Sequence, residues 1–380
     1  MRTLTRAILC ALMLAGLGCL ATHAGTQPPF SPEYEKKVGE KTVAKVETQY
    51  ERYKDAETQA KLDAMATEIA AASARPEVTY DVRLIDTEEV NAFSIPGGFI
   101  YVTKGLLDEV QSDHELAGVL AHEMAHNCTY DALIQAERNK DLFTGSVAAA
   151  IAAILLGAGS QEISTVMVAG EYVRRGVLGG YSIQIERMAD HHGAEYVMKT
   201  SYNPVGLLTF MERLAAQERR EPPRELGVFQ THPLAVERVE LLADFLHDSG
   251  VEINRRATTS WERPRAEQVK ANEQDAALVT LWGEDLFLVL TPGPDHETLM
   301  QRAEAIVQVL TDLLADGMEG FEVRLSERDG NPAVVATGEA IVVIYPEDAQ
   351  AHDLEQAALA GQVKDALRAA LRKESLDRLF

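Results

Sequence analysis

The sequence predicts an α+β protein with two domains: a mainly helical one that contains a short sheet, and a smaller α/β one after it. In the first part of the chain, long runs of good helix formers alternate with two short strand-like stretches. The composition then turns polar over residues 258–276, and two similar strand-and-helix segments follow. We therefore expect a first domain at 25–257, a linker at 258–276 and a second domain at 277–380.

Residues 1–24 are typical of a secretory leader, because two arginines precede an apolar run at 7–20 and small residues follow. The apolar run is too short for a comfortable membrane span. Cleavage after Ala24 would release the mature chain. Alternatively, the sequence GLGC resembles a lipobox and would leave a lipidated Cys19 after a leader of residues 1–18. In both cases the sequence predicts an exported, periplasmic protein, and in the second case a membrane-anchored lipoprotein.

Charge and cysteine content narrow the class of protein. The formal net charge of −23 disfavours nucleic acid as a partner, because so acidic a chain repels a phosphate backbone. Beyond the leader the chain has one cysteine, Cys128, so the sequence predicts no intrachain disulfide framework. We interpret Cys128 as a small packing residue on a helix rather than as a soft metal ligand.

The first domain begins with a predicted helix over residues 31–73, which contain good helix formers and no glycine–proline break. Alternating apolar residues predict a strand at 78–86. A Pro-Gly-Gly turn at 96–98 then leads into a second strand, Phe99–Thr103. Because Pro96 stands at its entrance, this strand is expected at an edge of the sheet.

The rest of the first domain is predicted to be helical. Ser112 lies three residues before Glu115, which is a capping box that opens a helix. Residues 142–161 carry no charge, but their glycine, serine and alanine content favours a buried or membrane-touching helix over a membrane span. Further helices are predicted at 184–199, 202–217 and 231–246, the last two with a proline near the first turn.

The second domain is predicted to contain two strand-turn-strand-helix repeats. Residues 277–292 resemble residues 333–348, with a Gly-Glu pair in the same hairpin position of each, and a helix is expected after each segment. An extra strand is expected at Phe321–Leu325. This domain contains no cluster of catalytic residue types, so we interpret it as a docking or dimerisation module.

The sequence HEMAH, residues 122–126, points to a zinc site. On a helix, His122 and His126 lie one turn apart on the same face, so both imidazoles can bind one ion. Glu123 follows about 100° around the helix, where it can take a proton from a water molecule at the metal. The pattern therefore predicts metal-assisted hydrolysis.

A catalytic zinc site needs a third protein ligand. The metzincin pattern would place a histidine where this chain has Ala132, which excludes that class. Glu186 and Asp190 lie four residues apart, so Glu186 can bind the ion while Asp190 accepts the ring N–H of a ligand histidine. His191 and His192 are the competing candidates, but they point about 100° and 200° away from Asp190 on a helix.

Five separated motifs then carry a resemblance to a known family. The sequences NAFSIPGGFIYVTKGLL, ELAGVLAHEMAH, YSIQIERMAD, YNP and THPLAVER resemble, in this order, motifs of the zinc metallopeptidase family that includes HtpX, BepA and the CAAX prenyl endopeptidase. The resemblance covers residues 32–245. It implies a gluzincin, which is a mainly helical zincin domain with Zn²⁺ on His122, His126 and Glu186.

The resemblance also implies further roles. Glu123 would be the general base, and the strand after Pro-Gly-Gly would be an edge to which an unfolded substrate adds as an extra strand. His232 would approach the metal, either to stabilise the oxyanion or to occupy the open position as a latch. Arg238 matches the last arginine of the THP motif.

The chain departs from the family pattern at three positions. Met188 replaces a frequent glutamate, Ile183 replaces an arginine, and Asp131 replaces a histidine five residues after the second ligand. None of these changes removes a ligand or the base, so they concern the substrate more than the chemistry.

The expected function is a zinc endopeptidase that acts on misfolded or unassembled cell-envelope proteins. One alternative is a chaperone-like assembly factor whose metal site is latched by His232. Another is a structural zinc protein whose C-terminal domain binds envelope complexes, although a structural site would not need the base Glu123. The substrate and the oligomeric state do not follow from the sequence.

Overall fold

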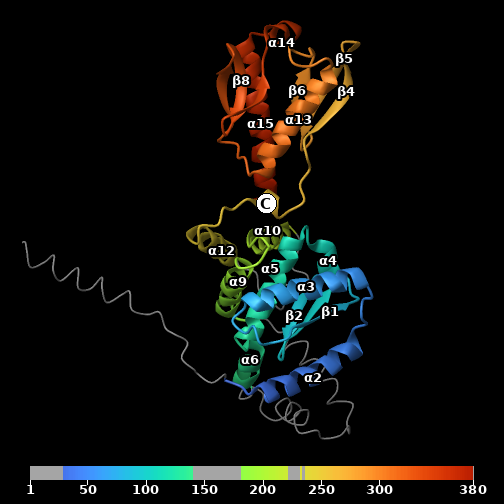
Figure 1. The fold of residues 1–380 in the computed structure, drawn as a ribbon, viewed down its shortest axis with the longest axis vertical. Helices are drawn as coiled ribbons and strands as arrows, with labels where there is room; N and C mark the ends of the chain where they lie inside the picture. The colour runs from blue at the N-terminus through green and yellow to red at the C-terminus, as the bar shows by residue number, and fades with distance from the viewer. Residues whose placement is uncertain (1–28, 140–180, 221–231, 233–235, 380) are drawn as a thin grey trace, which may run out of the picture.

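The computed structural model describes residues 29–139, 181–220, 232 and 236–379, which form two bodies stacked along the long axis of the molecule (Figure 1). The expectations for the leader, for Cys19 and for the uncharged segment 142–161 fall outside the described residues. Among the described residues, no helix is both long and apolar enough to cross a membrane.

The first body is mainly helical and contains one small sheet, in agreement with the predicted α+β class. Its elements are α2 (Pro32–Gln49), α3 (Ala56–Ala72), β1 (Asp81–Ile85), β2 (Ala92–Ile95), β3 (Phe99–Thr103), α4 (Lys104–Glu109), α5 (Asp113–Cys128), α6 (Asp131–Asn139), α9 (Ile183–Val197), α10 (Val205–Arg220) and α12 (Val236–Asp248).

The helix expected over residues 31–73 is divided into α2 and α3. The backbone of Tyr50 is extended, and the N–H of Tyr53 donates to the carbonyl of Leu84, which joins this segment to the end of β1. Asp55 then accepts the N–H groups of Glu57 and Thr58 and starts α3 as its N-cap. A tertiary contact and a new cap therefore interrupt a sequence that has helix propensity throughout.

The sheet corrects one expectation. Its strand order is β1-β3-β2, so the strand after Pro-Gly-Gly, β3, lies in the centre and not at an edge. β1 pairs with β3 in parallel and β2 pairs with it antiparallel. Pro96 lies in the turn between β2 and β3, where its missing N–H removes no bond from the sheet. Gly97 and Gly98 complete this turn with φ of 89° and 87°, which favour glycine.

The helix that carries HEMAH, α5, is the central element of the first body. Ser112 caps it as predicted, while the carboxylate of Glu115 accepts the N–H of Gln111. Its residues from Glu115 to Cys128 are buried between β2, α9 and α10. A Cβ on Gly193 of α9 would lie 2.9 Å from the backbone nitrogen of His122, so this glycine lets the two helices approach closely.

The second body consists of two three-stranded antiparallel sheets, each followed by helices. Its elements, after the 3₁₀ helix η2 (Arg255–Ala257), are β4 (Arg265–Ala271), β5 (Gln274–Leu281), β6 (Glu284–Val289), α13 (Leu299–Ala315), β7 (Arg324–Arg328), β8 (Asn331–Ala336), β9 (Glu339–Val343), α14 (Pro346–Ala351) and α15 (Gln356–Leu379).

Two details of this body differ from the expectation. Each unit has a third strand, because β4 lies within the segment expected to be a linker and β7 occupies 324–328 rather than 321–325. The β5–β6 and β8–β9 hairpins turn alike, with positive φ at Trp282-Gly283 and at Thr337-Gly338. β5 and β8 also carry a bulge two to three residues before these turns.

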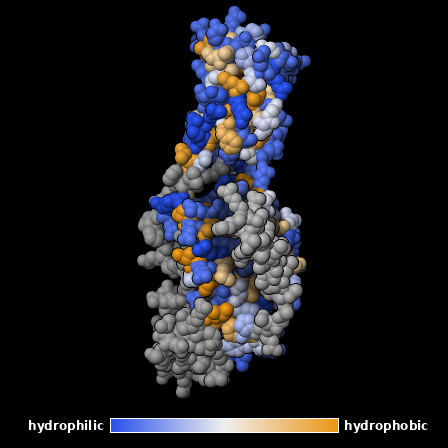
Figure 2. All heavy atoms as spheres, turned by 90° about the vertical axis from the view of Figure 1, so that its left-hand side faces the viewer, coloured by the Kyte–Doolittle hydropathy of each residue, from blue (hydrophilic) through white to orange (hydrophobic). Residues whose placement is uncertain are grey.

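The two bodies meet where α10 packs against α15 (Figure 1). η2 lies at this junction and carries two adjacent arginines that pair in opposite directions. Arg255 forms a bidentate ion pair with Glu212 of α10, and Arg256 forms one with Glu374 of α15. On the face shown in Figure 2, hydrophobic residues lie scattered among polar ones over both bodies.

Candidate metal centre

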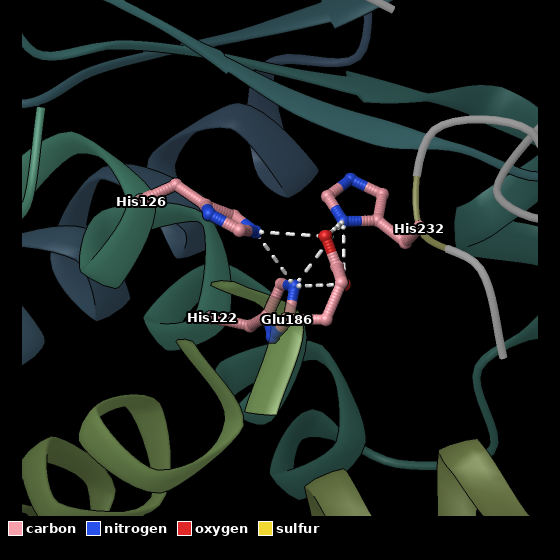
Figure 3. Close-up of side chains that lie close together, drawn as sticks. All are labelled: His122, His126, Glu186 and His232. Atoms are coloured by element: carbon pink, nitrogen blue, oxygen red, sulfur yellow. Dashed lines mark hydrogen bonds and ion pairs between the residues drawn. The ribbon is translucent and has the colours of Figure 1, made fainter. Parts of the chain in front are cut away.

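Four buried side chains from three parts of the chain converge on one point (Figure 3). His122 and His126 come from α5, Glu186 comes from the first turn of α9, and His232 comes from the segment before α12. The Nε2 atoms of the two α5 histidines lie 3.1 Å apart, and each lies 3.4 Å from a carboxylate oxygen of Glu186. This spacing suits one ion held among them, because ligands about 2.1 Å from a tetrahedral zinc lie about 3.4 Å from one another.

His232 completes the cluster on the side opposite the α5 histidines (Figure 3). Its Nδ1 lies 3.0 Å from Oε1 of Glu186 and 3.3 Å from Nε2 of His122. Its other ring nitrogen, Nε2, lies 3.3 Å from Oε1 of Glu123. The four donors, three imidazole nitrogens and one carboxylate, are the types that Zn²⁺ prefers in proteins, so the cluster fits this ion.

Asp190 and Arg238 stand directly behind the cluster. One turn after Glu186, Asp190 has an oxygen 3.0 Å from Nδ1 of His122, although the ring N–H is not aligned with it. Arg238 of α12 donates to both oxygens of Asp190, at 2.8 and 2.7 Å, and lies 2.8 Å from Glu186. The structure thus brings Asp190 to the back of a cluster histidine, and a buried arginine joins the two carboxylates of α9.

Two contacts of His126 did not follow from the sequence. Oδ2 of Asp131 lies 2.8 Å from Nδ1 of His126 and orients this imidazole. In the sequence, Asp131 stood out only as a departure from the family pattern. The ring of Tyr181 stacks on His126 with the centroids 4.2 Å apart. Asp131 follows the end of α5 and a left-handed Tyr130, where helical periodicity no longer applies. Tyr181 is the first residue of the motif YSIQIERMAD, but the sequence assigned it no role.

Glu123 lies beside the cluster and is 2% exposed. A cavity of about 40 Å³ adjoins it, lined by His122, Glu123 and His232 on one side and by apolar residues of α10 such as Phe210 on the other. This volume has room for a water molecule. A carboxylate, an apolar wall and a space for water therefore adjoin the candidate metal position.

The charges of the cluster depend on one another. Burial alone would lower the pKa of His122, but Asp190 and Glu186 raise it to about 10. Burial would likewise raise the pKa of Glu186, but His232, His122 and His126 hold it well below its usual range. The carboxylates and the imidazoles of the cluster thus stabilise one another's charged forms.

His191 and His192 lie outside this cluster. Both are on the outer side of α9, with side chains 45% and 34% exposed, and both contact Glu195. This placement agrees with the preference for Glu186 over either histidine as the residue that faces the α5 histidines.

Comparisons with known proteins divide the chain in the same way as the fold. Residues 56–245 match the model of peptidase family M48, and residues 278–374 match a model described as a domain of unknown function (DUF8459). α2 lies outside the first of these segments.

The chain is similar over part of its length to several proteases. It is 27% identical over 183 residues to the mitochondrial metalloendopeptidase OMA1 of Schizosaccharomyces pombe, covering 48% of this chain and 51% of that protein. It is 30% identical over 164 residues to the beta-barrel assembly-enhancing protease of Escherichia coli O157:H7, covering 41% of this chain and 32% of that protein. It is also 27% identical over 167 residues to metalloprotease YcaL of Escherichia coli K12, covering 44% and 61% of the two chains. The similarity thus spans a third to three fifths of these relatives.

Proposed function

Because the chain belongs to peptidase family M48, we propose that it is a zinc-dependent endopeptidase that cleaves misfolded or unassembled polypeptides of the cell envelope. The observation that carries the proposal is the burial of two histidines and a glutamate around one point, with a second glutamate beside them. A purely structural zinc site would not need Glu123 next to a space for water.

In the proposed mechanism His122, His126 and Glu186 hold Zn²⁺. The bound ion would lower the pKa of a water molecule and polarise the carbonyl of the scissile bond. Glu123 accepts the proton of the attacking water and passes it to the leaving amine. Asp190 and Asp131 hold the imidazoles of His122 and His126 in place from behind.

We assign His232 the role of a fourth donor that occupies the open position until substrate displaces it. Its contacts with Glu186, His122 and Glu123 support this role, because a side chain in that place would supply a fourth donor to a bound ion and faces the base. A histidine that stabilised an oxyanion would instead need space between itself and the metal. His232→Ala is therefore expected to increase hydrolysis modestly, and a large loss would assign His232 to transition-state stabilisation.

The substrate class is proposed from two sources. The leader at residues 1–24 predicts export, and several relatives are named beta-barrel assembly-enhancing proteases. The C-terminal domain lies outside residues 56–245, which match the peptidase family model, and we propose that it binds envelope complexes. β2, and not the central strand β3, is the edge strand beside α5, so the extended substrate is expected to add to β2.

The activity is tested with casein as an unfolded substrate. Hydrolysis by the purified protein is expected to fall about 10²–10⁴-fold in Glu123→Gln, because the variant loses the base but keeps every proposed ligand. Glu240→Gln, an exposed glutamate on α12, is the matched control and should not change the rate. Undiminished hydrolysis by Glu123→Gln would contradict the mechanism.

The chaperone-like alternative has an observation in its favour, since His232 joins the cluster rather than standing away from it. It predicts that the wild-type protein prevents an unfolded polypeptide from aggregating without cleaving casein, and that His232→Ala, which removes the latch, cleaves it. Cleavage of casein by the wild-type protein at a rate close to that of His232→Ala would exclude this alternative.

A further inference from the structure

We propose that His191, His192 and Glu195 form a second, exchangeable site for a divalent transition-metal ion on the outer face of α9. A ligand atom from each of these residues lies within 4.8 Å of the other two. In the part of the chain that the structure describes, this is the one such group apart from the buried cluster. It does not depend on the proposed peptidase activity.

The donor atoms are spaced for coordination. Nε2 of His191 lies 3.8 Å from Oε1 of Glu195, and Nδ1 of His192 lies 3.1 Å from Oε2 of the same carboxylate. Ligands at 2.0–2.2 Å from a tetrahedral ion lie about 3.4 Å apart, between these two distances. Small side-chain rotations therefore suffice to bring the three groups onto one ion.

The surroundings keep the two imidazoles in place. The ring of His191 packs edge-on against Phe245 of α12, with the centroids 4.1 Å apart, and the ring of His192 stacks on Tyr196 at 6.4 Å. Less side-chain freedom is then lost when an ion binds. A cavity of about 500 Å³ adjoins both histidines, and it is also lined by Arg187, which pairs with Glu237.

The chemistry of the site separates it from the buried cluster. All three side chains are between a third and a half exposed, so water would occupy the remaining coordination positions. Two imidazoles and a carboxylate suit Zn²⁺, Ni²⁺ or Cu²⁺ rather than Mg²⁺ or Ca²⁺. With three exposed donors, this ion exchanges readily, whereas the ion in the buried four-donor cluster is retained.

The site lies on the same helix as Glu186 but faces away from it. Gly193, which contacts the backbone of His122, lies between the two histidines and Glu195 in the sequence. A metal ion bound at 191, 192 and 195 thus bridges the turn of α9 that packs against the first histidine of the buried cluster.

The test counts zinc ions bound to full-length protein by equilibrium dialysis against buffered micromolar Zn²⁺, followed by elemental analysis. The Glu123→Gln background is used throughout, so that the count is independent of hydrolysis and of self-cleavage. We expect two zinc ions per chain, and one after exhaustive dialysis against zinc-free buffer. In the double variant His191→Ala/His192→Ala we expect one ion under both conditions.

His247→Ala is the matched control, because His247 is an exposed histidine of α12 that lies 3.5 Å from the carboxylate of Asp248. It should retain two ions, whereas Glu195→Gln should bind the second ion at least about tenfold more weakly. One ion per chain in the parent protein would overturn the proposal, and so would a second ion that remains in the double histidine variant. Circular dichroism of each variant establishes that it is folded.

Discussion

The peptidase domain buries charged groups at its centre, whereas the C-terminal domain keeps its centre apolar. In the peptidase domain His122, Glu123, Glu186, Asp190 and Arg238 are at most 6% exposed and lie together. Among residues 265–376, whose side chains the structure describes, the buried charged residues are Arg302 and Asp348, which pair at 2.6 Å. The rest of that core consists of aliphatic residues, Met318 and Phe287.

The two domains therefore differ in how many charged groups they remove from water, which is energetically unfavourable. Buried ions are expensive, and a pair often stabilises no more than well-packed apolar residues would. A dense cluster therefore indicates that the charges serve a function, as proposed for the metal centre. The single pair in the C-terminal domain instead has a structural role. Arg302 of α13 also donates to the carbonyls of Thr291, which follows β6, and of Val343, the last residue of β9, and so connects the two sheets.

The largest expected effect is the loss of zinc on Glu186→Gln. A neutral amide replaces an anionic ligand poorly, and Glu186 is the only anion among the four donors. Elemental analysis after dialysis should find about no zinc in this variant and one ion per chain in Glu195→Gln, which changes the same helix on its outer face. If the double variant His191→Ala/His192→Ala lost the tightly bound ion while Glu186→Gln kept it, the assignment of the third ligand would be wrong.

The second prediction concerns the other domain. Arg302→Met leaves Asp348 buried without its cation, and should lower the free energy of unfolding of the C-terminal domain by about 3–5 kcal/mol. Urea denaturation followed by tryptophan fluorescence measures this, because both tryptophans, Trp261 and Trp282, pack against the C-terminal core. Zinc content should not change. A loss below about 1 kcal/mol would show that the pair contributes little.

A smaller effect is expected for Asp190→Asn. The amide still fits behind His122 but no longer carries the charge that favours the metal-bound imidazole. The affinity for zinc should fall about 10–100-fold, which corresponds to about 1.4–2.8 kcal/mol. Competition with a chelator of known affinity gives the value. An unchanged affinity would mean that Asp190 serves only to hold Arg238.

The smallest effect is a dependence of stability on pH. Burial would raise the pKa of Asp348, but Arg302, with help from Thr291, lowers it. A lowered pKa in the folded state means that the stabilisation is complete above the unfolded value of about 3.9 and is lost as the pH falls through the folded value. The urea midpoint of the C-terminal domain should therefore decrease below about pH 4. The same decrease in Asp348→Asn would assign it to other groups.

The sequence was informative about the candidate site because most of its residues obey one spacing. His122 and His126, and likewise Glu186 and Asp190, lie four residues apart on helices, so local geometry predicts that each pair shares a face. The four-residue spacing does not apply to Asp131, which follows the end of α5, or to Tyr181, whose stacking depends on how α9 approaches α5. The position of His232 came from the family resemblance and not from any spacing.

The fold was less predictable where pairing is long-range. The apolar sequence of β3 fits a central strand as well as an edge strand. β3 is central because β1, 18 residues earlier, pairs with it in parallel on the side opposite β2. The sequence of β4 resembles a polar linker because both faces of the strand are largely exposed, and only Ala266, Val269 and Ala271 are half-buried. Helix propensity also failed at residues 50–55, where a contact with β1 divides α2 from α3.

The two adjacent arginines of η2 have a mechanical consequence. Arg255 is fixed to α10 and Arg256 to α15, so a single peptide unit connects the anchor points of the two domains. α10 also supplies Phe210 to the wall of the cavity beside Glu123. Together with the packing of α10 against α15, these two ion pairs couple the C-terminal domain to the helix that borders the base.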